Sequence, residues 1–212
     1  MRYVKRLSEP ENLKERKEQW LQDFLKSGQK RPASSKYAHP KVREQLNAMS
    51  HNKCFYCETL LKDEPKEVDH HIEVSCDKTL AFEWENLYLS CKKCNAKVNH
   101  ADIPIDTVLD PCKDTNATIK AHIDFENEVI VAKDNSQKGL KTIQKYRLDT
   151  EHHDYHRMKK LREFDDTLRK MLPTKGYKHL TDQELAILKR FAQENQPYSL
   201  MFSICLEKYG LL

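Results

Sequence analysis

Apolar residues recur at helical spacing in the first part of the chain. They follow the three- and four-residue steps of one helix face, at Leu13, Trp20, Leu21, Phe24 and Leu25. Ser8-Glu9-Pro10-Glu11 just before them matches a capping box with a proline in the first turn, and Ser27-Gly28 offers an end. The pattern therefore predicts one N-terminal helix, followed by a basic loop over residues 28–40 that contains two prolines.

The rest of the chain changes from strand to helical periodicity. A short helix is expected over residues 41–50, with Val42, Leu46 and Met49 facing inward. Residues 117–133 alternate apolar and polar positions around Glu126-Asn127, which predicts a hairpin of two strands. From about residue 136 the spacing is helical again, and Thr181 to Glu184 form a second capping box. The expected class is α+β, with a small central unit between N-terminal helices and a helical C-terminal half.

Composition narrows the function classes. Only four glycines occur among 212 residues, and no phosphate-binding GxxxxGK[ST] loop is present. No long apolar run and no signal-peptide pattern is found, so a cytoplasmic protein without a membrane segment is expected. The net charge of +4 is divided unevenly, at +7 for residues 1–53, −6 for 54–110 and +3 for the remainder. An acidic centre between basic flanks suits a cation site presented to a polyanion, although such runs are also common on solvated surfaces.

Four of the seven cysteines form two CxxC pairs, Cys54/Cys57 and Cys91/Cys94. Each pair can turn both sulfurs toward one ion, and two pairs complete a closed tetrahedral site for structural Zn²⁺. The three others, Cys76, Cys112 and Cys205, have no partner pattern and are expected to be free thiols. The 33 residues between the pairs exceed the usual zinc-ribbon gap, which indicates a functional insert.

The insert carries Asp69-His70-His71 within a stretch that reads as a strand. Alternation along a strand would place His70 on the apolar side and Asp69 with His71 on the other, so an Asp69/His70 pair at one metal requires a strand end or a local twist. A histidine-rich run also occurs at Glu151 to His156, but without a partner motif, and it is expected to be a solvated first helical turn.

The stretch VDHHIEVS … WENLYLSCKKCNAKVN resembles the HNH endonucleases, the ββα-metal (His-Me finger) class, in their four-cysteine form. The resemblance implies that His70 is the general base, that Asn86 is the middle Asn of the motif, and that Asp69 and Asn95 bind the catalytic metal. Oxygen ligands of this kind suit Mg²⁺ or Mn²⁺. Asn86 would fix the loop between the strands and so orient the base. Lys97 and Lys92 could meet phosphate or could lie on a solvated helix face. His71 has no role in the pattern and is a supporting residue near the site, an exposed residue, or a residue that helps to hold the metal.

A narrower resemblance, over roughly residues 40–165, is to the HNH subunit of Septu-type and retron-associated antiphage defence systems (PtuB-like). It rests on KCFYCE, WENLYLSCKKCN, LDPCKD, HIDFENEVIVAK and GLKTIQKYRLD. It implies a nuclease that works with an ATPase subunit. Residues 1–50 would be a basic helical segment, 51–133 the nuclease core with its hairpin, and 134–212 a docking surface. DNA is the favoured substrate, and RNA is not excluded. The alternative is a non-catalytic zinc-knuckle protein that binds nucleic acid or scaffolds an ATPase.

Overall fold

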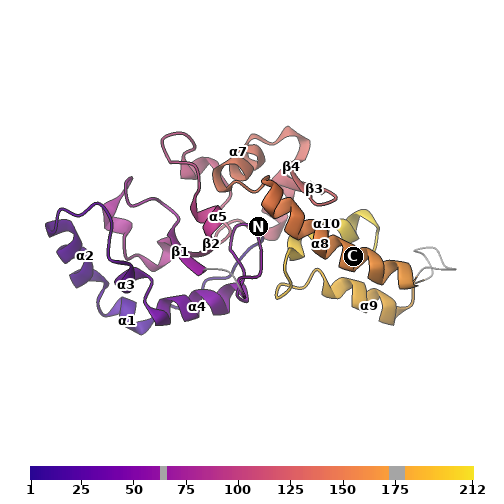
Figure 1. The fold of residues 1–212 in the computed structure, drawn as a ribbon, viewed down its shortest axis with the longest axis horizontal. Coiled ribbons are helices and arrows are strands. Elements are labelled where there is room, and N and C mark those ends of the chain that lie inside the picture. Colours follow the sequence, from indigo (N-terminus) through magenta and orange to yellow (C-terminus); the bar gives the residue numbers. More distant parts are fainter. Residues whose placement is uncertain (63–65, 172–179) are drawn as a thin grey trace.

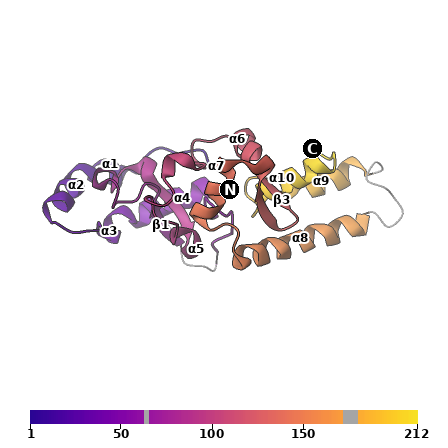
Figure 2. The ribbon, with the colours of Figure 1, turned by 90° about the horizontal axis from the view of Figure 1, so that it is seen from above.

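The computed structural model describes residues 1–62, 66–171 and 180–212. The molecule is elongated, with the N-terminal helices at one end, a small strand pair in the middle, and α8, α9 and α10 at the other end (Figure 1). Seen from above, α8 runs along one edge and α10 lies on the opposite side with α9 (Figure 2). Within the described residues, no helix is long and apolar enough to cross a membrane. The mixed α+β class with a helical C-terminal half is therefore confirmed.

The predicted N-terminal helix is divided into two, α1 (Glu11–Lys14) and α2 (Lys17–Lys26). Pro10 is the N-cap of α1 and no side chain caps it, so the predicted capping box does not form. Leu13 and Phe24 are buried as the pattern indicated, whereas Leu25 is 41% exposed. The Phe82 ring lies 6.3 Å from the Phe24 ring, so α2 packs against the segment that precedes the second strand. After the short α3 (Ser34–Tyr37), α4 (Pro40–Ser50) confirms the expected helix, with Val42, Leu46 and Met49 buried.

The central unit is an antiparallel pair, β1 (Lys66–His70) and β2 (Leu87–Cys91), followed directly by α5 (Lys92–Asn95). Asp69 pairs with Tyr88 and His70 pairs with Leu87, so both residues stand at the end of β1. All five residues of β2 are buried. Two 3-10 turns, η1 (Lys78–Leu80) and η2 (Trp84–Asn86), shape the connection between the strands. The two CxxC pairs, the strand pair and α5 thus lie together in the central part of the sequence.

The predicted hairpin is only half right. The strands are β3 (Ile123–Glu126) and β4 (Val129–Ala132), joined through Asn127 in the left-handed region at φ 56°. Residues 116–122 form a helix, α6 (Asn116–His122), because the Thr115 side chain caps it by accepting a hydrogen bond from the Thr118 amide at 3.2 Å. The prediction of a strand over residues 117–122 is therefore wrong, because Thr115 provides an N-cap that begins a helix there.

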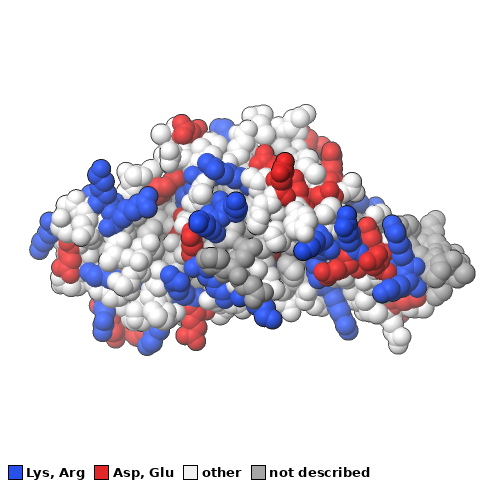
Figure 3. Space-filling model, in the orientation of Figure 1, with Lys and Arg blue, Asp and Glu red and all other residues white. Residues whose placement is uncertain are grey.

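The C-terminal half is helical, as expected. It contains α7 (Gln137–Tyr146), α8 (Glu151–Met171), α9 (Asp182–Arg190) and α10 (Ser199–Lys208), with the 3-10 turns η3 (Ile105–Thr107) and η4 (Lys133–Asn135) preceding them. The capping box of α9 is present, with reciprocal bonds between Thr181 and Glu184. Lysine, arginine and acidic side chains are interspersed over α8, while blue side chains predominate on the N-terminal and central parts of the same face (Figure 3).

The expectation for Glu151 to His156 is wrong at one residue. These residues do begin α8, but His153 is only 1% exposed and its Nε2 lies 3.6 Å from Cys94 Sγ. Arg157, one turn later, is also buried and donates to the backbone carbonyls of Glu128 and Leu148 at 2.6 and 2.8 Å. One face of the first two turns of α8, which carries His153 and Arg157, is therefore buried against the rest of the molecule.

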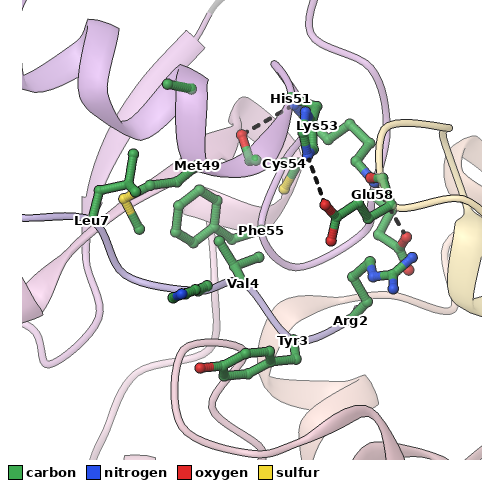
Figure 4. Close-up of a pocket in the computed structure, with 14 residues that line it drawn as sticks. Arg2, Tyr3, Val4, Leu7, Met49, His51, Lys53, Cys54, Phe55 and Glu58 are labelled. Carbon is green, nitrogen blue, oxygen red and sulfur yellow. Dashed lines mark hydrogen bonds and ion pairs between the residues drawn. The ribbon is translucent and has the colours of Figure 1, made fainter.

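A buried ion pair flanks the first cysteine pair, and both of its members also bind the C-terminal segment. Lys53 lies 3.7 Å from Glu58, and both side chains are 4% exposed. Lys53 also donates to the carbonyls of Glu194 and Gln196, and the Ser199 hydroxyl donates to Glu58 at 2.7 Å. Figure 4 shows Lys53 and Glu58 facing each other at one side of a small pocket of about 200 Å³, opposite Val4 and Phe55. The N-terminal amino group of Met1 also lies 3.3 Å from Glu58, so the residues next to Cys54 and Cys57 are held from both ends of the chain.

Candidate active site

The four paired cysteines form a buried cluster. Cys54, Cys57, Cys91 and Cys94 are at most 4% exposed, and their sulfur atoms all lie within 4.8 Å of one another. The tight turn of the first pair places Glu58 in the left-handed region, and the Cys94 amide donates to Cys91 Sγ at 3.4 Å. Four mutually close thiols with no other residue between them fit the closed tetrahedral coordination of zinc. The remaining three cysteines are free, as expected.

A cleft of about 500 Å³ opens beside this cluster, at the end of β1. Its lining brings together three of the predicted site residues, Asp69, His70 and Asn95, with Lys97 next to them. Asp69 and His70 reach the same cleft because β1 ends at His70 and the chain then turns, which resolves the conflict expected from strict alternation. Lys92 is exposed and does not line the cleft.

His70 is held in a defined tautomer. Its Nε2 lies 2.8 Å from the carbonyl oxygen of Ala81. Because a carbonyl oxygen can only accept, Nε2 must carry the proton, and the Nδ1 lone pair is left unprotonated. The Tyr37 ring covers the imidazole at a centroid distance of 4.5 Å. Burial lowers the pKa of His70 below its ordinary value, which favours the neutral form. A neutral imidazole with one free nitrogen at a cleft has the properties of a general base.

Asn86 lies behind the cleft and fixes the loop that holds His70. Its Oδ1 accepts from the Ile72 amide at 2.7 Å, and its Nδ2 donates to the carbonyls of Ile72 and Leu80 at 3.0 and 3.2 Å. Leu80 directly precedes Ala81, whose carbonyl oxygen accepts the hydrogen bond from His70 Nε2. Asn86 therefore acts on His70 through the backbone, and it does so without adding charge.

His71 is in a different environment from His70. It is 5% exposed, its ring is stacked on Tyr88 at 4.4 Å, and it does not line the cleft. The Tyr146 hydroxyl lies 3.3 Å from Nδ1, and Asp110 lies 3.5 Å from Nε2. Burial, only partly offset by Asp110, lowers the pKa of His71 to about 3. His71 is thus a neutral core residue, and the exposed alternative does not hold.

Asp69 and Asn95 have partners that the sequence did not indicate. Tyr56, between the first two cysteines, donates to Asp69 Oδ2 at 2.7 Å, and the Lys97 ammonium lies 2.8 Å from the same oxygen. The Asn95 amide group donates to Glu67, which precedes Asp69 by two residues on β1. Burial raises the pKa of Asp69, against the opposing effect of Lys97. Lys97 Nζ also lies 3.0 Å from Asp69 Oδ1, so both oxygens of Asp69 have partners within the chain in this arrangement.

Sequence reasoning also missed part of the cleft lining. Lys30, Arg31 and Tyr37 reach the cleft from the basic segment that follows α2. Lys30 and Arg31 are exposed, so their charges face solvent at the cleft. The only signal in the sequence was the excess of Lys and Arg over residues 1–53, which does not say which of them lie near His70.

Glu73, Cys76 and His100 form a second group of residues that could bind a metal, and one ligand atom of each lies within 4.8 Å of the other two. Two of the three are committed elsewhere. Glu73 is paired with the buried Lys145 at 2.7 Å, and His100 Nδ1 accepts from the Ile105 amide at 3.3 Å. We therefore assign no ion to this group.

Comparison with known proteins identifies the part of the chain that contains the cysteine cluster and the cleft residues Asp69, His70 and Asn95. A profile of the HNH endonuclease family matches residues 54–101, which contain both cysteine pairs and the strand pair. A Septu protein PtuB of Bacillus thuringiensis is 33% identical over 145 residues, which are 68% of this chain and 52% of that protein. A Septu protein PtuB of Bacillus mycoides (strain KBAB4) is 28% identical over 144 residues, covering 53% of this chain and 48% of that protein. The chain thus spans about half the length of the curated relatives it matches. Residues 54–101 are an HNH endonuclease domain of the four-cysteine form, in a chain homologous to the Septu PtuB proteins.

Proposed function

We propose that the chain is an endonuclease that hydrolyses phosphodiester bonds of nucleic acid, with DNA as the favoured substrate. The observation that carries this proposal is the contact between His70 Nε2 and the Ala81 carbonyl, 2.8 Å long, at the wall of the cleft. It leaves Nδ1 free to take a proton from a water molecule as that water attacks phosphorus. A protein that only binds nucleic acid has no use for a neutral imidazole held in one tautomer.

The substrate backbone would enter past the exposed charges of Lys30 and Arg31. Both residues line the cleft that also contains His70. Basic side chains at a cleft attract the phosphate backbone whatever its sequence, so they position the scissile bond without reading bases. Neither group distinguishes DNA from RNA, and the preference for DNA rests on the family alone.

We further propose that this nuclease is the effector of an antiphage defence system and works with an ATPase subunit. The two PtuB homologues support the first part, because both carry the name of the Septu system. The helices after residue 134 are the proposed docking surface. The proposed domains are therefore a basic N-terminal segment over residues 1–50, the nuclease core over 51–133 and the docking region over 134–212. α7 packs on β4, and α8 and α10 also contact the β3–β4 hairpin, so the proposed docking surface would be formed by the outward faces of α8, α9 and α10.

The test is a cleavage assay with the purified chain, alone and together with its ATPase partner. We expect supercoiled plasmid DNA to be nicked or linearised when Mg²⁺ or Mn²⁺ is added, and to stay intact in excess EDTA. A labelled RNA of similar length, assayed in parallel, determines the substrate class. If no nucleic acid is cut with either ion, with the partner present, the non-catalytic alternative replaces the proposal.

We also propose that the four cysteines hold a structural zinc ion and that His153 supports it. Four thiolates around Zn²⁺ carry a net charge of −2, so donors to their sulfur atoms stabilise the site. His153 Nε2 faces Cys94 Sγ at 3.6 Å and comes from α8, outside the family match. α8 is thereby connected to the helix that carries Asn95.

Replacing His153 with leucine is expected to speed the loss of zinc to a chelator by about tenfold, because supporting residues change metal affinity by about 10- to 100-fold. His153→Gln keeps an N–H donor and should release zinc more slowly than His153→Leu. His156→Ala, three residues along the same helix and only half-buried, is the matched control. The measurement is zinc release followed with a chromogenic chelator. Equal release rates for His153→Leu and wild type would contradict the assigned contact.

A further inference from the structure

Lys97 points its ammonium group into a nest of oxygen atoms instead of into the open cleft. Asp69 Oδ1 and Oδ2 lie 3.0 and 2.8 Å from Nζ, and the carbonyl oxygen of His71 lies 3.0 Å away. The carbonyl oxygen of His70 is a fourth acceptor. The Lys97 side chain is 5% exposed, although its backbone lies beyond the end of α5. In this position the N–H bonds of the ammonium group are directed at these oxygens, so Lys97 would have to turn toward the cleft to contact a phosphate.

The nest has the chemistry of a divalent cation site. Two carboxylate oxygens and two backbone carbonyls form an all-oxygen set with one negative charge, which is the kind of ligand set that Mg²⁺ and Ca²⁺ take. A carboxylate as buried as Asp69 also needs a positive partner, since a buried charge without one is costly. Lys97 meets this need with one charge from the chain itself.

The carboxylate in this nest, Asp69, is also a ligand that the resemblance to HNH endonucleases implies for the catalytic ion. Both oxygens of Asp69 are in contact with Lys97, and Asn95 is turned toward Glu67 through its amide nitrogen. A divalent ion and the ammonium group therefore compete for one carboxylate. Two cations at this distance from each other also repel, so the two arrangements exclude one another.

We propose that Lys97 is an internal cation that occupies the metal position on Asp69 and must withdraw before a divalent ion binds there. This inference rests on the proposed function, because it takes Asp69 as the ligand. The withdrawn side chain would extend into the cleft, where Lys30 and Arg31 already lie. There its charge would face the phosphate backbone. Binding of nucleic acid and binding of the ion would then favour each other, and the nuclease would hold its ion weakly in the absence of substrate.

The first test measures Mn²⁺ binding without nucleic acid, by electron paramagnetic resonance of the free ion. We expect Lys97→Met to bind Mn²⁺ at least about tenfold more tightly than wild type, because a competing and repelling charge is removed. Lys92→Met removes an exposed lysine from the adjacent helix and should leave the affinity unchanged. The double variant Asp69→Asn/Lys97→Met has no buried charge to leave unpaired, and it should lose the gain. Equal or weaker binding by Lys97→Met would overturn the inference.

The second test uses the wild-type chain, so it does not depend on the stability of a variant. Lysine acetylation by a water-soluble reagent, read by mass spectrometry, should leave Lys97 protected in the absence of divalent ions and modify Lys92 readily. Adding Mn²⁺ and a non-cleavable nucleic acid should expose Lys97 to the reagent by at least several-fold, with Lys92 as the reference. If Lys97 stays protected under conditions that support cleavage, the inference fails while the proposed function stands. If no cleavage occurs under any condition, the proposed function fails independently of this result.

Discussion

Replacing His70 with alanine is expected to lower the rate of phosphodiester cleavage by about two to four orders of magnitude, the contribution of a positioned general base. The reason is the geometry at the end of β1. The Ala81 carbonyl fixes the proton on Nε2, Asn86 holds the preceding carbonyl of Leu80, and the Nδ1 lone pair is left for the attacking water. The measurement is single-turnover cleavage of plasmid DNA with saturating Mn²⁺, with zinc content and thermal unfolding as checks that the fold is kept.

His71→Ala is the comparison that tests the choice between the two histidines. His71 is buried in an aromatic cluster and does not line the cleft, so its loss should reduce stability and affect cleavage much less than the loss of His70. A cavity and an unpaired Tyr146 hydroxyl would be left behind, at a cost of about 1–3 kcal/mol. If His71→Ala abolishes cleavage while a folded His70→Ala cuts at the wild-type rate, the base is assigned to the wrong residue.

Much of the cleft could be predicted because its residues lie close together in the sequence. Asp69 and His70 end β1, between the cysteine pairs, and Asn95 ends α5, directly after Cys94, and the order of these elements is part of a recognisable pattern. The apparent conflict between Asp69 and His70 arose from assuming that the strand continues. It ends at His70, and a pattern of alternation does not show where pairing stops.

The remaining site residues depend on contacts across long stretches of chain. Tyr37 and His70 are brought together by the packing of the N-terminal segment, and His153 reaches Cys94 from 59 positions away. Lys97 was expected either to meet phosphate or to lie on a solvated helix face, and its burial rules out the second of these. Its direction toward Asp69, another residue that lines the cleft, follows from the burial of that carboxylate. Sequence patterns report which face is apolar, but they do not report which charges a buried group will recruit.

The hairpin error has a similar origin. Alternation over residues 117–122 is compatible with a strand, but the Thr115 cap and the packing of Ile119 into the core favour a helix. Tertiary burial and a local cap together outweighed the weak strand preference of a six-residue segment. The strands β3 and β4 were predicted where the alternation is joined by an Asn in the left-handed region.

Replacing Cys91 with serine is expected to remove zinc from the chain and to unfold its central unit. Structural zinc contributes an apparent binding free energy of about 10–16 kcal/mol in small zinc-binding peptides, so loss of one of four ligands removes a large part of the stability. The four sulfur atoms are buried within 4.8 Å of one another, and without an ion their thiolates would repel. The expected result is less than one zinc per chain and poor solubility, measured by elemental analysis and by the yield of soluble protein.

The effect should extend to the cleft, which separates this prediction from a general loss of stability. Cys91 is the last residue of β2, and Cys94 lies in α5 directly before Asn95. An unclamped α5 would no longer hold Asn95 beside Asp69 and His70 at the cleft, so cleavage should be lost in whatever soluble protein remains. Cys76→Ser changes an exposed thiol outside the cluster and should keep zinc, solubility and cleavage. A Cys91→Ser protein that keeps one zinc and full cleavage would show that the cluster does not hold the ion, because the three remaining thiols leave its coordination incomplete.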